Sequence, residues 1–290
     1  MSRIKTSIIG LLLLAAALLG GCSSVRLAYG NGAQLAWWWL DGQVDFSSEQ
    51  APRVKQGIAA LLEWHRGSQL PAYAALLATA GQQVLEPTTP ELACRWQTRV
   101  RDVLEPTLQR ALALAAEQSA GLGAAQFKHL EQRYAKGIAE MRDDFLQPDL
   151  AERQARSLER AVERAERLYG RLAPAQLQVL REGVLASPFD PELWLQERQR
   201  RQREVLGTLR RLAAEKAVAD QRLAAMRALA AHTEASPNPV YRAYQLKLAS
   251  YNCALAARIH NAAPPAQRQQ ARETLKGWEE DLRALMAPPA

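Results

Sequence analysis

Apolar residues recur every three or four positions through almost the whole chain beyond residue 33, and this period constrains the fold more than any other feature. Ala271, Leu275, Trp278, Leu282 and Leu285 follow it near the end of the chain, which places them on one face of a helix. No long stretch alternates apolar and polar residues, and Val and Ile are sparse beside Ala and Leu. The sequence therefore predicts an all-α fold.

Proline and glycine residues interrupt the periodic segments and set the limits of the predicted helices. These limits give ten segments: 33–41, 48–66, 70–84, 90–117, 124–144, 149–170, 174–186, 190–231, 238–261 and 265–286. No linker between them is long enough to mark a domain boundary. We expect one domain, a mostly antiparallel array of about eight to ten helices.

The first 22 residues have the pattern of an export signal. Arg3 and Lys5 precede a short apolar run at 8–18, and Leu-Gly-Gly then leads into Cys22. The run is too short and wrongly flanked for a membrane span. A cysteine in this place resembles the lipobox of bacterial lipoproteins. The resemblance implies cleavage before Cys22, a diacylglycerol thioether on its sulfur and an acyl chain on the new amino terminus, and we expect no other cofactor.

That resemblance divides the chain into a signal peptide at 1–21, a lipidated tether at 22–32 and the helical domain at 33–290. Ser23 follows the cysteine, whereas Asp in this place signals inner-membrane retention by the lipoprotein sorting rule. We therefore expect an anchor in the outer membrane of a Gram-negative bacterium, on the periplasmic side. The short tether keeps the domain close to the lipid surface.

The charge balance is basic, and arginine outnumbers lysine 30 to 7. The net charge of +7 falls to +5 when Arg3 and Lys5 leave with the signal peptide. The arginine excess has two explanations, genomic composition or contact with anionic lipid or another anionic polymer, because guanidinium groups bind phosphate well. No basic block stands beside stacking aromatic residues, so we expect no nucleic-acid partner.

Cys94 and Cys253 are the remaining cysteines. An exported protein can keep a disulfide, and both residues fall on helix faces of small residues, where helices approach closely. The alternative is a pair of buried free thiols.

Two predicted helices are rich in arginine. In 149–170, Glu152 and Arg156 have the spacing of an i,i+4 ion pair on a solvated face. In 190–231, Arg198 falls within the apolar sector, so we expect it either to meet a carboxylate or carbonyl group or to snorkel from an edge. Other arginines of this segment gather on the opposite side and face solvent or lipid headgroups: Arg200, Arg203, Arg210 and Arg211.

Four predicted helices begin alike, with a glutamine three residues after the residue that precedes the helix: Gln50, Gln126, Gln176 and Gln267. In this place the side chain can reach back to a free backbone N–H group. The pattern also resembles the LTxxQ signature of small helical periplasmic stress chaperones, although Thr is missing at all four places.

Trp37, Trp38 and Trp39 point to three sides of a helix that lies about 15 residues from Cys22. Either a ring dips into the membrane interface, which tryptophan favours, or all three rings are wedged between protein helices.

Trp64, His65 and Arg66 precede a helix that carries Tyr73. They either line a polar pocket or pack in the interior. With Arg198 they form our set of candidate pocket or interaction residues.

No pattern of catalytic or metal-binding residues is present. The four histidines are scattered, and the chain has no Gly-x-Ser-x-Gly, no Gly-rich phosphate loop and no Cys-x-x-Cys. We therefore expect no enzyme and no metal, and name no catalytic residue.

Several of these segments together resemble an uncharacterised family of Gram-negative lipoproteins, a domain of unknown function. The likeness rests on Cys22 with 27–31, on 40–50, on Trp64 through Leu77, and more weakly on 259–275. It implies a helical, envelope-located lipoprotein and supplies no activity. Members often have Cys where Arg66 stands, so a family disulfide pattern does not transfer.

These observations favour a lipid-anchored envelope protein that binds a protein or lipid partner through a helical face without catalysis. One alternative is a holdase-like periplasmic chaperone. Another is an envelope enzyme or small-ligand binder with a pocket near His65 and Arg66.

Overall fold

The computed structural model describes residues 29–286, and this part of the chain folds into eleven α-helices with no strand. The prediction of an all-α fold is confirmed. The signal peptide and Cys22 lie outside the described residues. The helices are α3 (Gly32–Val44), α4 (Ala51–Ser68), α5 (Leu70–Gln83), α6 (Pro90–Gln118), α7 (Ala124–Phe145), α8 (Leu150–Tyr169), α9 (Pro174–Leu185), α10 (Pro191–Ala214), α11 (Ala219–Glu234), α12 (Pro239–Asn261) and α13 (Pro265–Met286).

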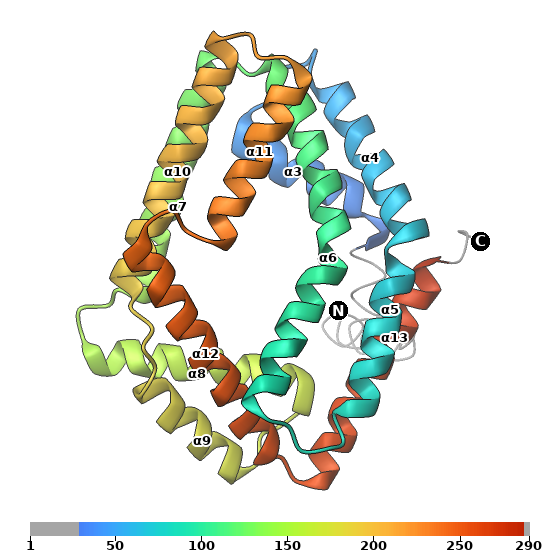
Figure 1. Cartoon of the computed structure of the whole chain (residues 1–290), viewed down its shortest axis with the longest axis vertical. Coiled ribbons are helices and arrows are strands. Elements are labelled where there is room, and N and C mark those ends of the chain that lie inside the picture. Colours follow the sequence, from blue (N-terminus) through green and yellow to red (C-terminus); the bar gives the residue numbers. More distant parts are fainter. Residues whose placement is uncertain (1–28, 287–290) are drawn as a thin grey trace, which may run out of the picture.

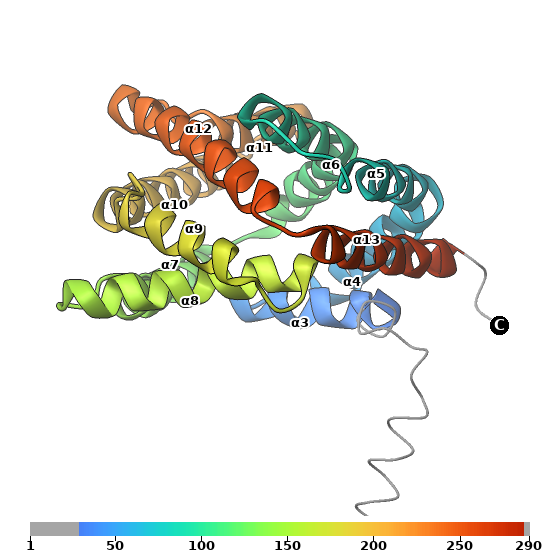
Figure 2. The ribbon, with the colours of Figure 1, turned by 90° about the horizontal axis from the view of Figure 1, so that it is seen from below.

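The helices pack in pairs and small groups rather than around one central helix (Figures 1 and 2). The most extensive contact joins α5 and α13, which are far apart in sequence. α6 packs against α11 and α12, α7 against α10, α8 against α9, and α3 against α4 and α7. None of the helices in the described part is long and apolar enough to cross a membrane.

Three separate hydrophobic clusters stabilise this arrangement. The largest lies between α6, α7, α10 and α11 and includes Phe127 and Leu206. A second joins α8 and α9 to the ends of α12 and α13 around Leu180 and Ala271. A small third cluster holds Trp37 of α3 against α4. The arginine-rich helices α8 and α10 therefore belong to different cores.

The segment predicted as one helix at 190–231 is two helices, so that prediction is wrong. α10 ends at Ala214, and Lys216 takes a left-handed backbone conformation with φ 48°. α11 then starts after Val218, whose backbone N–H donates to Gln221 Oε1 at 3.0 Å. Gln221 stands three residues after the residue that precedes its helix, as do the four glutamines named in the sequence analysis. The sequence therefore contained the pattern that marks the start of α11.

The predicted hydrogen bond from a backbone N–H to the glutamine at the start of a helix is confirmed at three of the four places. Gln50, Gln126 and Gln176 each accept from the backbone N–H three residues earlier, at 2.9, 3.0 and 3.1 Å. Gln267 differs because Pro264 has no N–H to donate, and its amide donates instead to the Arg171 carbonyl.

A disulfide joins Cys94 of α6 to Cys253 of α12, with their Cα atoms 5.3 Å apart. Of the two alternatives left by the sequence, the structure has the bridge. It links helices 159 residues apart in the chain and so ties the largest cluster to the helix that packs against α9.

Candidate functional site

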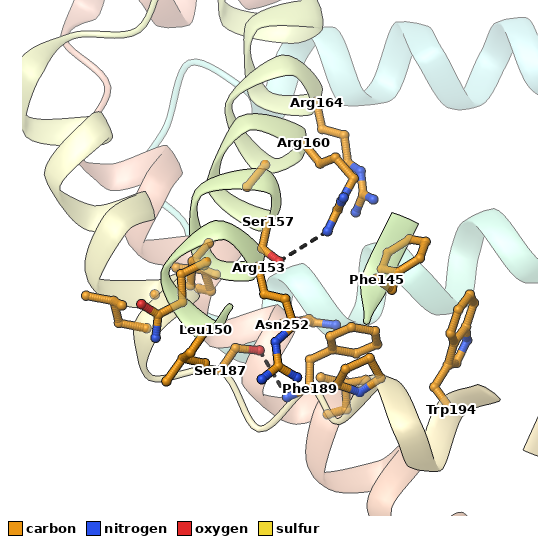
Figure 3. A pocket seen from close by; sticks show the side chains of 18 residues that line it. Phe145, Leu150, Arg153, Ser157, Arg160, Arg164, Ser187, Phe189, Trp194 and Asn252 are labelled. Carbon is orange, nitrogen blue, oxygen red and sulfur yellow. Dashed lines mark hydrogen bonds between the residues drawn. The ribbon is translucent and has the colours of Figure 1, made fainter. Parts of the chain in front are cut away.

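A cavity of about 570 Å³ lies between α8, α9, α12 and the start of α10 (Figure 3). This volume is in the range of small-molecule sites, roughly 300–1,000 Å³. The wall between α9 and α12 depends on Gly183, because a Cβ there would lie 2.3 Å from Leu255 Cδ1. The Tyr251 hydroxyl holds the same contact by donating to the Gly183 carbonyl at 2.6 Å.

One face of α8 supplies three cations to this cavity. Arg153, Ser157, Arg160 and Arg164 follow at intervals of four, three and four residues, which places them in one stripe along the helix. Figure 3 shows Arg160 and Arg164 on the same side of α8 and Arg153 extending toward Phe189. Arg160 donates to Ser157 Oγ and to the carbonyl of Asp144, both at 3.2 Å.

The positive charge of this stripe is not balanced within the cavity. None of the residues lining it is Asp or Glu, and among the described residues Arg153, Arg160 and Arg164 form no ion pair. Arg153 Nε is buried without a hydrogen-bond partner. Burial, followed by the neighbouring Arg164, lowers the pKa of Arg160. Asp144 and Glu159 act on this pKa in the opposite direction. The cavity therefore has cationic lining residues and no lining carboxylate to balance them.

The opposite wall is apolar and aromatic. Phe145, Phe189 and Trp194 pack edge to face or tilted, with ring centroids 5.2 to 6.3 Å apart. The Arg160 guanidinium carbon lies 4.4 Å from the Phe145 centroid, a cation–π contact. Aliphatic side chains complete this wall: Leu150, Val184, Leu185, Leu248 and Leu255.

Sequence reasoning missed this cavity because it treated α8 as a solvated face. The Glu152–Arg156 pair it expected does form, at 3.6 Å. The overlooked signal is the pair Arg160 and Arg164, two like charges at i,i+4 on the face that also carries Arg153. Such repeats destabilise a helix and can indicate that an anion from outside the helix belongs beside it.

Arg198 takes the edge position that the sequence offered as one alternative. It is exposed and lines a second, smaller cavity of about 250 Å³ with Tyr134, Trp194 and Tyr241. The buried charge of α10 is instead its neighbour Glu197, whose side chain is 2% exposed.

Glu197 is the centre of an ion-pair network. Arg200 contacts both of its carboxylate oxygens at 2.9 Å, Arg201 Nε donates at 3.1 Å and Ser236 Oγ at 2.8 Å. Burial alone raises the pKa of Glu197, but these hydrogen bonds outweigh burial and lower it. Arg200 also pairs with Glu204 at 2.8 Å, so the arginines at this end of α10 are neutralised.

The outer arginines of α10 predicted to face solvent or lipid headgroups are mostly paired as well. Besides Arg200, Arg210 contacts Glu131 and Arg211 contacts Glu215, both at 3.0 Å.

The predicted pocket near His65 is a packed cluster. The Tyr29 hydroxyl lies 2.9 Å from His65 Nδ1, and the Tyr73 ring meets the His65 ring edge to face at 5.2 Å. Arg66 lies over the Tyr29 ring at 5.6 Å. Burial lowers the pKa of His65. Neither cavity described above is lined by His65 or Arg66.

Trp64 and Arg198 do not join that cluster. Trp64 packs under Arg110 of α6, with the guanidinium carbon 5.3 Å from its ring centroid. Arg198 belongs to α10, on the opposite side of the molecule from α4 in Figure 1.

The three consecutive tryptophans divide between interior and surface. Trp37 is 8% exposed and stacks on Phe46, whereas Trp38 and Trp39 are 63% and 66% exposed. The interpretation that places all three rings inside the protein is therefore wrong. Trp37 to Trp39 span about 200° around the helix axis, so one core cannot receive all three.

His260, within the weaker part of the family likeness, has a structural role. Its Nε2 donates to the Glu86 carbonyl at 2.7 Å, so its Nδ1 accepts from the Tyr169 hydroxyl at 2.8 Å. Burial lowers the pKa of His260 and raises that of Tyr169 to about 12. Asn261 exchanges two hydrogen bonds of 2.9 Å with the backbone of Thr88.

The arginine-lined cavity therefore offers groups for binding rather than for proton transfer. Arginine remains protonated and donates only, and Ser157 has no base beside it in the cavity. No group of three or more His, Cys, Asp or Glu that could hold a metal ion occurs among residues 29–286.

Comparison with known proteins gives a family without a function. Residues 42–229 match DUF6279, described as a family of unknown function. The match contains all of α8 and α10. No curated protein and no solved structure matches the chain.

Proposed function

The chain belongs to the DUF6279 family, and on that premise we propose that it is a non-enzymatic binding protein of the cell envelope whose ligand is an amphipathic anion. The observation that carries this proposal is the cavity in which three unpaired arginines of α8 face an aromatic and aliphatic wall.

The ligand class follows from the two walls. A phosphate or carboxylate group accepts charge-assisted hydrogen bonds from the guanidinium groups that line the cavity. A hydrocarbon chain covers the wall formed by Phe145, Phe189 and Trp194. A free inorganic anion would leave the aromatic wall exposed to water. A neutral apolar molecule would leave the arginines without an anionic partner. Single-chain phospholipid-like molecules and fatty acids have both parts.

The envelope location is supported by the sequence. The lipobox-like run before Cys22 favours a protein held by a diacylglycerol group and an amino-terminal acyl chain, and Ser23 favours the periplasmic side of the outer membrane. Replacing Cys22 by Ser tests this part alone. The wild-type chain should fractionate with the outer membrane of a Gram-negative host and the Cys22→Ser chain should not. An unchanged distribution would contradict the anchor.

The cavity is tested by calorimetric titration of the full Cys22→Ser chain with decyl phosphate, decyl maltoside and inorganic phosphate. Decyl phosphate should bind at least tenfold more tightly than either of the others. Arg160→Gln together with Arg164→Gln should weaken it by about 10- to 100-fold, because a hydrogen bond to a charged group contributes about 1.5–3 kcal/mol.

Arg156→Gln is the matched control. Arg156 belongs to the same helix, pairs with Glu152 and does not line the cavity, so its loss should leave the affinity within twofold. Equal binding of decyl maltoside and decyl phosphate would overturn the anionic assignment. Binding of inorganic phosphate alone would overturn the amphipathic one. If an unfolded client protein binds in place of decyl phosphate and the arginine substitutions have no effect, the chaperone alternative replaces this proposal.

A further inference from the structure

The outer face of α3 is apolar and uncharged. Leu35, Trp38, Trp39 and Gly42 are spaced by three, one and three residues and are all exposed, and at 100° per residue they share one sector of about 100°. Trp37 lies on the opposite side and is the residue that fixes α3 to Val54 and Ile58 of α4. The helix therefore has an inner apolar face that packs and an outer one that does not.

Two adjacent tryptophans exposed by about two thirds need a partner. A large aromatic ring in water loses the favourable free energy of burial, and tryptophan is the residue most typical of the boundary between lipid and water. α3 lies along the outer edge of the molecule in Figure 2, so a flat surface can reach it.

The position of the chain ahead of α3 identifies that partner. Cys22 stands ten residues before Gly32, and an extended chain spans at most about 3.5 Å per residue. A lipid on Cys22 therefore holds the start of α3 within about 35 Å of the bilayer.

We propose that α3 lies in the plane of the bilayer that holds the anchor, with Trp38 and Trp39 in the headgroup region. The inference shares the lipid on Cys22 with the proposed function but does not depend on the cavity. It gives the molecule a fixed orientation on the membrane instead of free rotation on a tether.

Fluorescence quenching tests the orientation. The full lipidated chain is placed in vesicles of phosphatidylethanolamine and phosphatidylglycerol with brominated acyl chains. Tryptophan emission should be quenched, and Trp38→Phe with Trp39→Phe should remove most of that quenching. Trp278→Phe is the control, since this ring is 39% exposed on α13, and it should change the quenching little. Equal quenching in the wild type and the double variant would overturn the inference.

Vesicle co-sedimentation of the Cys22→Ser chain without residues 1–21 measures the affinity in the absence of both the lipid anchor and the apolar signal segment. Trp38→Ser with Trp39→Ser should lower the partition coefficient at least tenfold. Leu246→Ser, which removes a side chain 69% exposed on α12, should leave it within twofold. If the unsubstituted chain shows no vesicle binding and forms a dimer that the two serines disperse, a second copy covers this face and the bilayer is excluded. Arg160→Gln should not alter either readout, so failure of the cavity proposal is distinguishable.

Discussion

The helices α8 and α10 are both rich in arginine, yet their arginines have opposite surroundings. In α10, Glu197 stands three and four residues before Arg200 and Arg201 and neutralises both. In α8, Arg160 contacts Ser157, the Phe145 ring and the backbone carbonyl of Asp144, and among the described residues neither Arg160 nor Arg164 forms an ion pair. Arginine content alone therefore does not indicate an anion site. The decisive property is whether a carboxylate shares the face on which the guanidinium groups lie.

The disulfide joins α6, which shares a hydrophobic cluster with α10, to α12, which lines the cavity with α8. Its loss should have the largest effect. Replacing Cys94 and Cys253 together by Ser should lower the free energy of unfolding by about 4 kcal/mol, because the bridge closes a loop of 159 residues. Binding in the cavity should weaken too, since α12 supplies part of its wall. Urea denaturation and titration measure the two effects. Two free thiols in the unreduced, denatured wild-type protein would contradict the bridge.

Removing the Glu197 carboxylate of α10 should lower the free energy of unfolding nearly as much as removing the disulfide. Glu197→Gln should reduce the free energy of unfolding by about 2–3 kcal/mol, because it removes the negative charge beside two partly buried guanidinium groups and puts an amide NH2 where Arg200 Nε needs an acceptor. Glu215→Gln, at the C-terminal end of the same helix, is the control. Its pair with Arg211 is more than half exposed, so the change should stay below about 0.5 kcal/mol. Equal losses in the two variants would remove the distinction drawn for Glu197.

Low pH should remove the stability that the ion pairs of α10 contribute, whereas the arginines of α8 should not respond to it. Burial raises the pKa of Glu197 and of Glu204, but hydrogen bonds, from Arg200 to the first and from His232 and Arg200 to the second, outweigh it and lower both values. A carboxyl group with a lowered pKa stabilises the fold above its unfolded value of 4.5, and this contribution is lost as the pH falls through the folded value.

The free energy of unfolding, measured in urea at a series of pH values, should therefore fall progressively below about pH 4.5. Glu197→Gln with Glu204→Gln should flatten this part of the profile. Arg160→Gln should keep the wild-type slope, because arginine does not titrate in this range. A double carboxyl variant with the full acid slope would assign the loss to other groups.

The smallest effect is expected for the stability contribution of the cavity arginines. Arg160→Gln should change the free energy of unfolding by no more than about 1 kcal/mol, because the lost cation–π contact is offset by relief of repulsion from Arg156 and Arg164. Chemical denaturation without ligand measures this value. A loss as large as that of Glu197→Gln would mean that α8 needs its arginines for folding rather than for binding.

Local patterns in the sequence were enough for the all-α fold and for most helix limits. Proline and N-capping residues such as Thr89, Asp149 and Asn238 mark helix starts through contacts within a few residues, and such contacts are readable in one dimension. The error at 215–218 came from overlooking Gln221, which repeats a pattern already recognised elsewhere.

The surroundings of individual side chains depended on contacts that no local pattern contains. The helical period placed Arg198 within the apolar sector, but the packing of α10 against the Ser236 turn made its neighbour Glu197 the buried charge. Tyr29 and Tyr73 pack against the His65 ring, so these side chains fill the space in which the sequence analysis offered a pocket.

The sequence by itself determined the helical architecture, because that depends on spacing and residue type along the chain, and the same kind of evidence is what predicts export and an anchor at Cys22. Only the tertiary structure decided which arginines stay unpaired, which tryptophans of α3 reach the surface and where the cavity forms. These properties depend on which faces meet across α8, α9, α10 and α12, and burial is set by neighbours that are up to about a hundred residues away in the chain.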